Sequence, residues 1–134
     1  MVIGKQSSDV HSPILTQAIV ELHLEKGLLP DHLKRICAAY RKQLTAMLEG
    51  FSFFPEGTQH TLPQGGLFVW AELPEGMDAM AALNRAIDQN VAFVPGAHFY
   101  PDGGYANTLR LNFSMQEADD IRAGMERLGR AIKG

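Results

Sequence analysis

The sequence predicts a two-layer α+β domain in which helices pack on one face of a small, mainly antiparallel sheet. Stretches with helical spacing and stretches with strand-like alternation follow one another in the order helix, helix, strand pair, helix, strand, strand, helix. The 134 residues suit a single domain, and the 46% of hydrophobic residues can form a core. No internal repeat or low-complexity tract interrupts this order.

Two helices are expected in the first 50 residues. Ser12 is expected to cap the first helix and Pro13 to be its first helical residue, while Gly27 and Pro30 are expected to close it. Its apolar stripe consists of Leu15, Ala18, Ile19 and Leu22. The second helix is expected to begin near Asp31. Its single buried stripe consists of Leu33, Ile36, Cys37, Tyr40, Leu44, Met47 and Leu48.

A pair of strands is expected between Phe51 and Pro74, on either side of a turn at residues 63–66. The glycines of this turn, Gly65 and Gly66, indicate a hairpin that needs positive φ. Alternation places Leu67, Val69 and Ala71 on one face of the second strand and Phe68 and Trp70 on the other. The last two could line a ligand cleft, but packing within the protein is the interpretation that we favour.

The second half of the chain predicts a helix at about residues 78–89, a short strand at 91–94 and an irregular loop at 97–106. The buried stripe of that helix consists of Met80, Leu83 and Ile87. A strand at residues 108–113 then leads to a last helix, for which Ser114 and Glu117 predict a capping box. The core-facing stripe of the last helix consists of Ala118, Ile121, Met125, Leu128 and Ile132.

Arg110 lies in the middle of the strand at residues 108–113. Alternation points Leu109, Leu111 and Phe113 to one side, and Thr108, Arg110 and Asn112 to the other. A guanidinium held on a rigid strand suits bidentate binding of a carboxylate. The alternative is that Arg110 belongs to the solvated face of an edge strand.

Other polar residues do not predict a catalytic or metal site. The five histidines lack metal-ligand spacing on one helix, and Cys37 is interpreted as a small core residue rather than a nucleophile. Asp119 and Asp120 suit the first turn of a helix, whose dipole they complement. A formal net charge of −3 without charge blocks does not favour nucleic acid or an anionic membrane as a partner. No membrane-spanning run or signal peptide is evident and Cys37 is the single cysteine, so we expect a cytoplasmic protein.

Three segments occur in an order and spacing that resemble a known family. They read Pro-Gln-Gly-Gly-Leu-Phe-Val-Trp at residues 63–70, Val-Pro-Gly-Ala-His-Phe at 94–99 and Arg-Leu-Asn-Phe-Ser at 110–114. The chain thereby resembles, from about Gly4 to Lys133, the C-terminal part of the fold-type-I aminotransferases that depend on pyridoxal 5'-phosphate, especially the 2-aminoadipate aminotransferases. The resemblance implies that residues 1–12 are a residual interdomain segment and that residues 13–134 are the small C-terminal domain.

The resemblance also implies roles for residues and partners. Arg110 matches the arginine that binds the α-carboxylate of the amino-acid substrate, and a 2-oxo acid is the second substrate. The Schiff-base lysine of the family lies upstream of the matched segments and Lys5 is not its counterpart, so we expect the chain to be an inactive fragment without catalytic or cofactor-binding residues. The large domain of a homodimeric parent would supply them, and the parent would transfer an amino group from an amino acid to the oxo acid.

Two other functions remain open. Some bacterial transcription regulators join a winged-helix DNA-binding domain to an aminotransferase-like domain that senses an effector, and their C-terminal thirds resemble this chain. A stand-alone α+β ligand-binding module is the other alternative. The preferred substrate side chain also stays open, because residues 102–107 depart from the basic or glycine-rich run that is common in the family.

Overall fold

The computed structural model describes residues 2–8 and 10–134. Contacts divide the chain into two compact units, Met1–Ala38 and Ala39–Gly134, which are described separately. The predicted division into residues 1–12 and 13–134 stays a prediction.

In the residues that the structure describes, the regular elements of the first unit are helices. It contains α1 (Val2–Ser8), α2 (Ile14–Glu25) and the beginning of α3 (Leu29–Gly50). Pro13, not Ser12, is the N-cap of α2, so the predicted cap is one residue early. The Ser12 carbonyl instead accepts a hydrogen bond of 2.7 Å from Nε2 of Gln17. No residue of α2 is buried, and its large apolar side chains, Ile14, Leu15, Ile19, Val20, Leu22 and Leu24, are all exposed.

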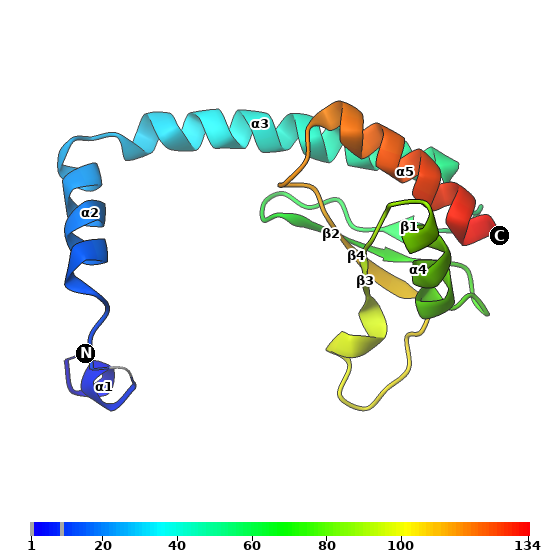
Figure 1. Ribbon diagram of the computed structural model, residues 1–134, viewed down its shortest axis with the longest axis horizontal. Helices are drawn as coiled ribbons and strands as arrows, with labels where there is room; N and C mark the ends of the chain where they lie inside the picture. The colour runs from blue at the N-terminus through cyan, green and yellow to red at the C-terminus, as the bar shows by residue number, and fades with distance from the viewer. Residues whose placement is uncertain (1, 9) are drawn as a thin grey trace. The chain divides into compact units, whose positions relative to one another are not determined.

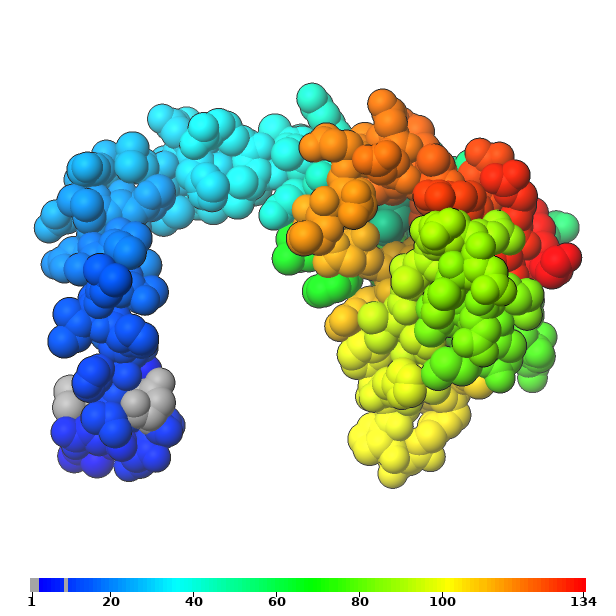
Figure 2. All heavy atoms as spheres, in the orientation of Figure 1, coloured from blue at the N-terminus to red at the C-terminus, as the bar shows by residue number. Residues whose placement is uncertain are grey.

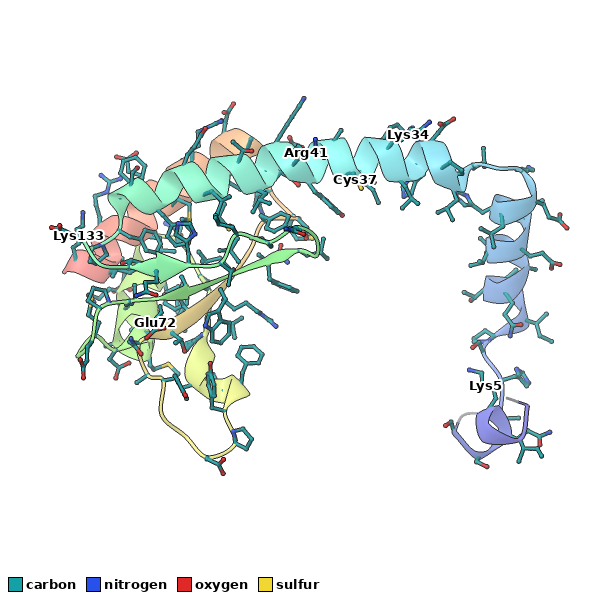
Figure 3. The ribbon with its side chains drawn as sticks, turned by 180° about the vertical axis from the view of Figure 1, so that it is seen from behind. Lys5, Lys34, Cys37, Arg41, Glu72 and Lys133 are labelled. Carbon is teal, nitrogen blue, oxygen red and sulfur yellow. The ribbon has the colours of Figure 1, made fainter. Side chains whose placement is uncertain are left out.

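Helix α3 begins earlier than the sequence predicts and buries only part of the expected stripe. Pro30 does not close the preceding helix but lies in the first turn of α3, where the missing N–H costs no helical hydrogen bond. The core draws on α3 only from Tyr40 onwards. Cys37 is therefore exposed, and its interpretation as a buried core residue is wrong (Figure 3).

The second unit contains a four-stranded sheet in the order β1-β2-β4-β3, and every neighbouring pair is antiparallel (Figure 1). The central strands are β2 (Phe68–Glu72) and β4 (Thr108–Asn112), with the short β1 (Gln59–His60) and β3 (Val94–Pro95) at the edges. Gly66, in the connection between β1 and β2, has φ 81°, as the predicted hairpin turn requires.

Helices cover one face of this sheet (Figure 1). This layer comprises the end of α3, α4 (Ala79–Asp88) and α5 (Ala118–Lys133). The inward-facing residues of β2 and β4 form the core together with residues of these helices. The strands contribute Val69, Ala71, Leu109 and Leu111, and the helices contribute Met47, Ala82, Ala86, Ile121, Met125, Leu128 and Ile132. The predicted α+β class, with helices on one face of an antiparallel sheet, is confirmed.

The buried stripe of α4 differs by one position from the prediction. Ala79, Ala82 and Ala86 are buried, whereas Met80 and Ile87 are 42% and 55% exposed, and of the predicted stripe Leu83 packs partly buried against the core. Both triplets have helical spacing, and the larger side chains were taken for the core-facing ones. The small alanines allow α4 to lie close to the layer that it covers.

Two other local predictions are corrected. Strand β3 comprises only Val94 and Pro95, and the amide of Val91 donates instead to the Ala86 carbonyl at the end of α4. The capping box is absent as well. Glu117 is itself the N-cap of α5 and makes no side-chain cap bond, while the Ser114 hydroxyl donates to Oδ1 of Asn112 at 3.0 Å.

Candidate functional site

The candidate site lies on the sheet face opposite the helices. Trp70 of β2 and Arg110 of β4 are direct partners across the antiparallel ladder, and Phe68 pairs with Asn112 one step further along the same face. The neighbouring residues Val69, Leu109 and Leu111 are buried on the helix side. Alternation therefore sends Arg110 away from the core, as the sequence predicts.

Two aromatic rings contact the Arg110 guanidinium. Its central carbon lies 4.2 Å from the centroid of the Phe68 ring and 4.6 Å from the centroid of the Phe99 ring. Distances of this size are typical of cation–π stacking. We call this arrangement of Phe68, Arg110 and Phe99 the aromatic clamp.

The guanidinium has no acidic partner within the part of the chain that the structure describes. Its Nε atom is buried and makes no hydrogen bond to any described residue, and no ion pair of the described chain includes Arg110. A buried donor without an acceptor costs free energy. Because no described acceptor binds the guanidinium, the rings and the strand hold it in place. An incoming carboxylate would not have to displace an internal one.

Phe99 comes from a different element, the short helix η2 (Gly96–Phe99) that follows β3. The Trp70 ring meets the Phe99 ring edge-on at 5.7 Å and the Tyr100 ring at 6.1 Å. Tyr100 in turn stacks on Tyr105 at 4.0 Å. The loop carrying these aromatic residues projects from the second unit as the yellow lobe of Figure 2.

A groove of about 640 Å³ reaches the clamp from the helix-covered side, because most of its lining comes from α5, from residues 90–94 and from core residues such as Met47 and Leu111. Phe68 and Arg110 line it at the sheet, and Asp120 and Arg127 line it on α5. Its wall also includes residues 90–94, which lead from the end of α4 into β3. The volume falls within the range of small-molecule sites.

Of the other polar residues considered in the sequence, Asp120 lines the groove, and the five histidines and Cys37 are not among the lining residues. In the described part of the chain, no group of three or more His, Cys, Asp or Glu side chains is placed to hold a metal ion. The lysines labelled in Figure 3, Lys5, Lys34 and Lys133, lie on α1, α3 and α5 rather than on the sheet. Among the described residues, no helix is both long and apolar enough to cross a bilayer.

Residues 3–128 match the family described as aminotransferase class I and II, and the chain belongs to this family. It is 42% identical over 135 residues to a 2-aminoadipate transaminase of Thermus thermophilus, covering 100% of this chain and 34% of that protein. It is 40% identical over 132 residues to an aromatic-amino-acid aminotransferase of Thermococcus litoralis, covering 98% and 32%. The chain thus spans about a third of the length of these relatives.

Solved structures of the family show the same fold. The α-aminoadipate aminotransferase of Thermus thermophilus, complexed with N-(5'-phosphopyridoxyl)-L-leucine, matches 98% of this chain and 34% of its own with a TM-score of 0.88 and 42% identity. The multiple substrate aminotransferase of Thermococcus profundus matches 98% of this chain and 33% of its own with a TM-score of 0.90 and 40% identity.

The clamp itself was not predicted from the sequence. The sequence favours a packing role for Phe68, and the family resemblance implies that the Phe99 ring lies near the substrate without assigning it a contact with Arg110. The alternation of β2 does place Phe68 on the face of Arg110, which is a usable signal once the pairing of the two strands is known. No local pattern places Phe99 there, because its position depends on the path of η2.

Proposed function

We propose that the chain is the small C-terminal domain of an aminotransferase that depends on pyridoxal 5'-phosphate, and that Arg110 binds the α-carboxylate of its substrates. The parent would move an amino group between an amino acid and a 2-oxo acid. The observation that carries the role of Arg110 is a guanidinium fixed on a rigid strand, beside a groove, without an acidic partner among the described residues. A planar cation held in this way orients a carboxylate as well as attracting it.

The residues around Arg110 suit a carboxylate better than they suit the cofactor. The clamp and the groove contain no lysine, so they offer no amine for a covalent bond to the aldehyde of pyridoxal 5'-phosphate. We propose that the large domain of the parent supplies that amine, and that the cofactor supplies the electron sink of the reaction. No step of the cofactor chemistry is assigned to residues of this chain.

The role of Arg110 can be tested by steady-state transamination with the full-length protein that carries this chain. Arg110→Lys keeps the positive charge but loses the planar fork, so KM for the amino acid should rise about 10- to 100-fold. Arg130→Lys is the matched control, since Arg130 is exposed on α5 and, among the described residues, forms its ion pair with Glu126 at 3.6 Å. An unchanged KM in Arg110→Lys would refute the proposed role.

The proposal also predicts that the 134-residue chain alone does not transaminate. Incubation with pyridoxal 5'-phosphate, an amino acid and a 2-oxo acid should give no new amino acid above a protein-free control. Borohydride reduction followed by mass spectrometry should show no stoichiometric cofactor bond to the chain. Turnover that depends on the chain would contradict the proposal that the large domain supplies the amine for the cofactor.

The exposed apolar residues of α2 support further parts of the parent as partners. Apolar side chains gathered on one surface helix are typical of a surface that another element covers. We propose that the large domain covers it, within a parent that forms a homodimer in the cytoplasm. Size-exclusion chromatography with light scattering on the full-length protein tests the dimer, and a monomer would contradict it.

A regulatory function is the second candidate. An uncharacterized HTH-type transcriptional regulator of Escherichia coli is 26% identical over 120 residues, covering 87% of this chain and 25% of that protein. This similarity is weaker than the 42% and 40% identity to the two aminotransferases. A mobility-shift assay with the full-length protein and the DNA upstream of its own gene distinguishes the candidates, since a specific shift without transamination would favour the regulator.

A further inference from the structure

The geometry points to Phe68 and Phe99 as positioning residues that fix the plane of the Arg110 guanidinium, so that a carboxylate meets its edge and not its face. The inference rests on the proposed function of Arg110 as the carboxylate ligand and adds to it the device that orients the ligand. A positioning residue in this sense acts through Arg110 and need not touch the substrate.

The first argument concerns the faces of the guanidinium. The Phe68 ring comes from the neighbouring central strand and the Phe99 ring from η2, at 4.2 Å and 4.6 Å from the same guanidinium carbon. A guanidinium carries its N–H donors in its plane, and stacking on aromatic rings leaves that plane free. Two rings against one guanidinium limit its rotation, and the group still lines the groove, where its N–H donors can meet a carboxylate.

The second argument concerns what else could orient Arg110. Nε is buried without an acceptor, and no described carboxylate pairs with the guanidinium. The guanidinium is thus not held by the hydrogen bonds that usually fix an arginine side chain in a protein interior. Ring stacking and the strand backbone are the contacts that remain to set its orientation.

The third argument concerns the placement of Phe99. A Cβ atom at Gly96 would lie 2.7 Å from Cβ of Thr108 and 2.8 Å from Cη2 of Trp70. The absence of that atom lets η2 lie directly against the sheet, and Trp70 then meets the Phe99 ring edge-on at 5.7 Å. Trp70 thus contacts the Phe99 ring and also pairs with Arg110 across the ladder, which limits the movement of the ring beside Arg110 although Phe99 is 45% exposed.

The test is a calorimetric titration of the full-length protein with 3-phenylpropanoate, a carboxylic acid without an amino or keto group, and with 3-phenylpropan-1-ol as the uncharged analogue. Phe68→Leu and Phe99→Leu keep apolar bulk but remove the π face, so each should weaken binding of the acid about three- to fivefold. Binding of the alcohol should change less than about twofold. Phe99→Tyr keeps a ring and should restore the affinity for the acid.

Phe53→Leu is the matched control, because Phe53 and Phe68 are each 42% exposed and Phe53 belongs to η1 (Phe51–Phe53) instead of the clamp. Equal losses of affinity for the acid and the alcohol would show that the rings contact the ligand directly. An unchanged affinity for the acid would show that the rings do not position Arg110. Either result overturns the inference. If Arg110→Lys binds the acid with the affinity of the wild type, the proposed function of Arg110 is refuted too. A loss in Arg110→Lys without a loss in the phenylalanine variants overturns the clamp alone.

Discussion

The backbone of Gly96 packs directly against the side chain of Thr108, and a Cβ atom at position 96 would lie 2.7 Å from Cβ of Thr108. Thr108 cannot move away easily, because its hydroxyl donates to the Tyr105 carbonyl at 2.6 Å and its side chain is 1% exposed. This contact joins η2 to β4 two residues before Arg110. It sets how closely the loop with Phe99 approaches the sheet.

Gly96→Ala should therefore lower stability and disturb the candidate site. Forcing a methyl group into a packed contact costs about 1–3 kcal/mol. Urea unfolding of the chain, followed by the fluorescence of Trp70, its single tryptophan, measures the loss. Gly65→Ala is the control, since nothing lies within 4 Å of a Cβ atom at that position. Equal midpoints for the two variants would show that η2 does not depend on the close approach.

Two glycines of α5 should respond in opposite ways to alanine. A Cβ atom at Gly129 would lie 2.7 Å from Cβ of Phe53 and 2.8 Å from its carbonyl carbon, whereas nothing lies within 4 Å of one at Gly124. Gly129→Ala should destabilise by about 1–3 kcal/mol through overpacking. Gly124→Ala should stabilise by up to about 1 kcal/mol, because alanine favours a helix over glycine. Thermal unfolding of both variants checks the sign, and a shared sign would contradict the packing of α5 on η1.

Asp78 should contribute to stability as the N-cap of α4. Its Oδ1 accepts from the amides of Met80 at 2.7 Å and Ala81 at 3.1 Å. Asp78→Ala should cost about 1 kcal/mol in urea unfolding, while Asp78→Asn should be nearly neutral. Glu117→Ala is the comparison, because Glu117 caps α5 without a side-chain bond and should change stability by less than about 0.5 kcal/mol. A large loss in Glu117→Ala would restore the capping box that the sequence predicts.

Arg85 should link α4 to the end of α5. Its Nε donates to the Ala131 carbonyl at 2.7 Å and its Nη2 to the Ile132 carbonyl at 3.3 Å. These carbonyls lack helical partners, so Arg85→Met should cost about 1–3 kcal/mol. Hydrogen exchange of the last turn of α5 should rise in Arg85→Met and stay at the wild-type rate in the surface variant Arg122→Met. Unchanged protection in Arg85→Met would show that the bonds do not hold the helix end.

The strands of the candidate site were predicted better than the helices around it. Alternation alone separates Val69, Leu109 and Leu111 from Trp70 and Arg110, and the two groups do occupy opposite faces. Helical spacing was less informative, because in α4 both an alanine triplet and a larger apolar triplet repeat at the same interval. Which of them is buried depends on the helix that packs beside it.

Apart from α1, η1 and η2, the sequence by itself determined the order of the elements, and it also determined the family and the face of β4 that carries Arg110. Backbone geometry imposes the two-residue period of a strand wherever the strand lies. Tertiary structure alone decided that Phe68 and Phe99 enclose the guanidinium and that no described carboxylate does. Phe99 and Arg110 are brought together by strand register and by the close approach of Gly96 to the sheet. Contacts of this kind follow from packing between segments and leave no periodic signal in either one.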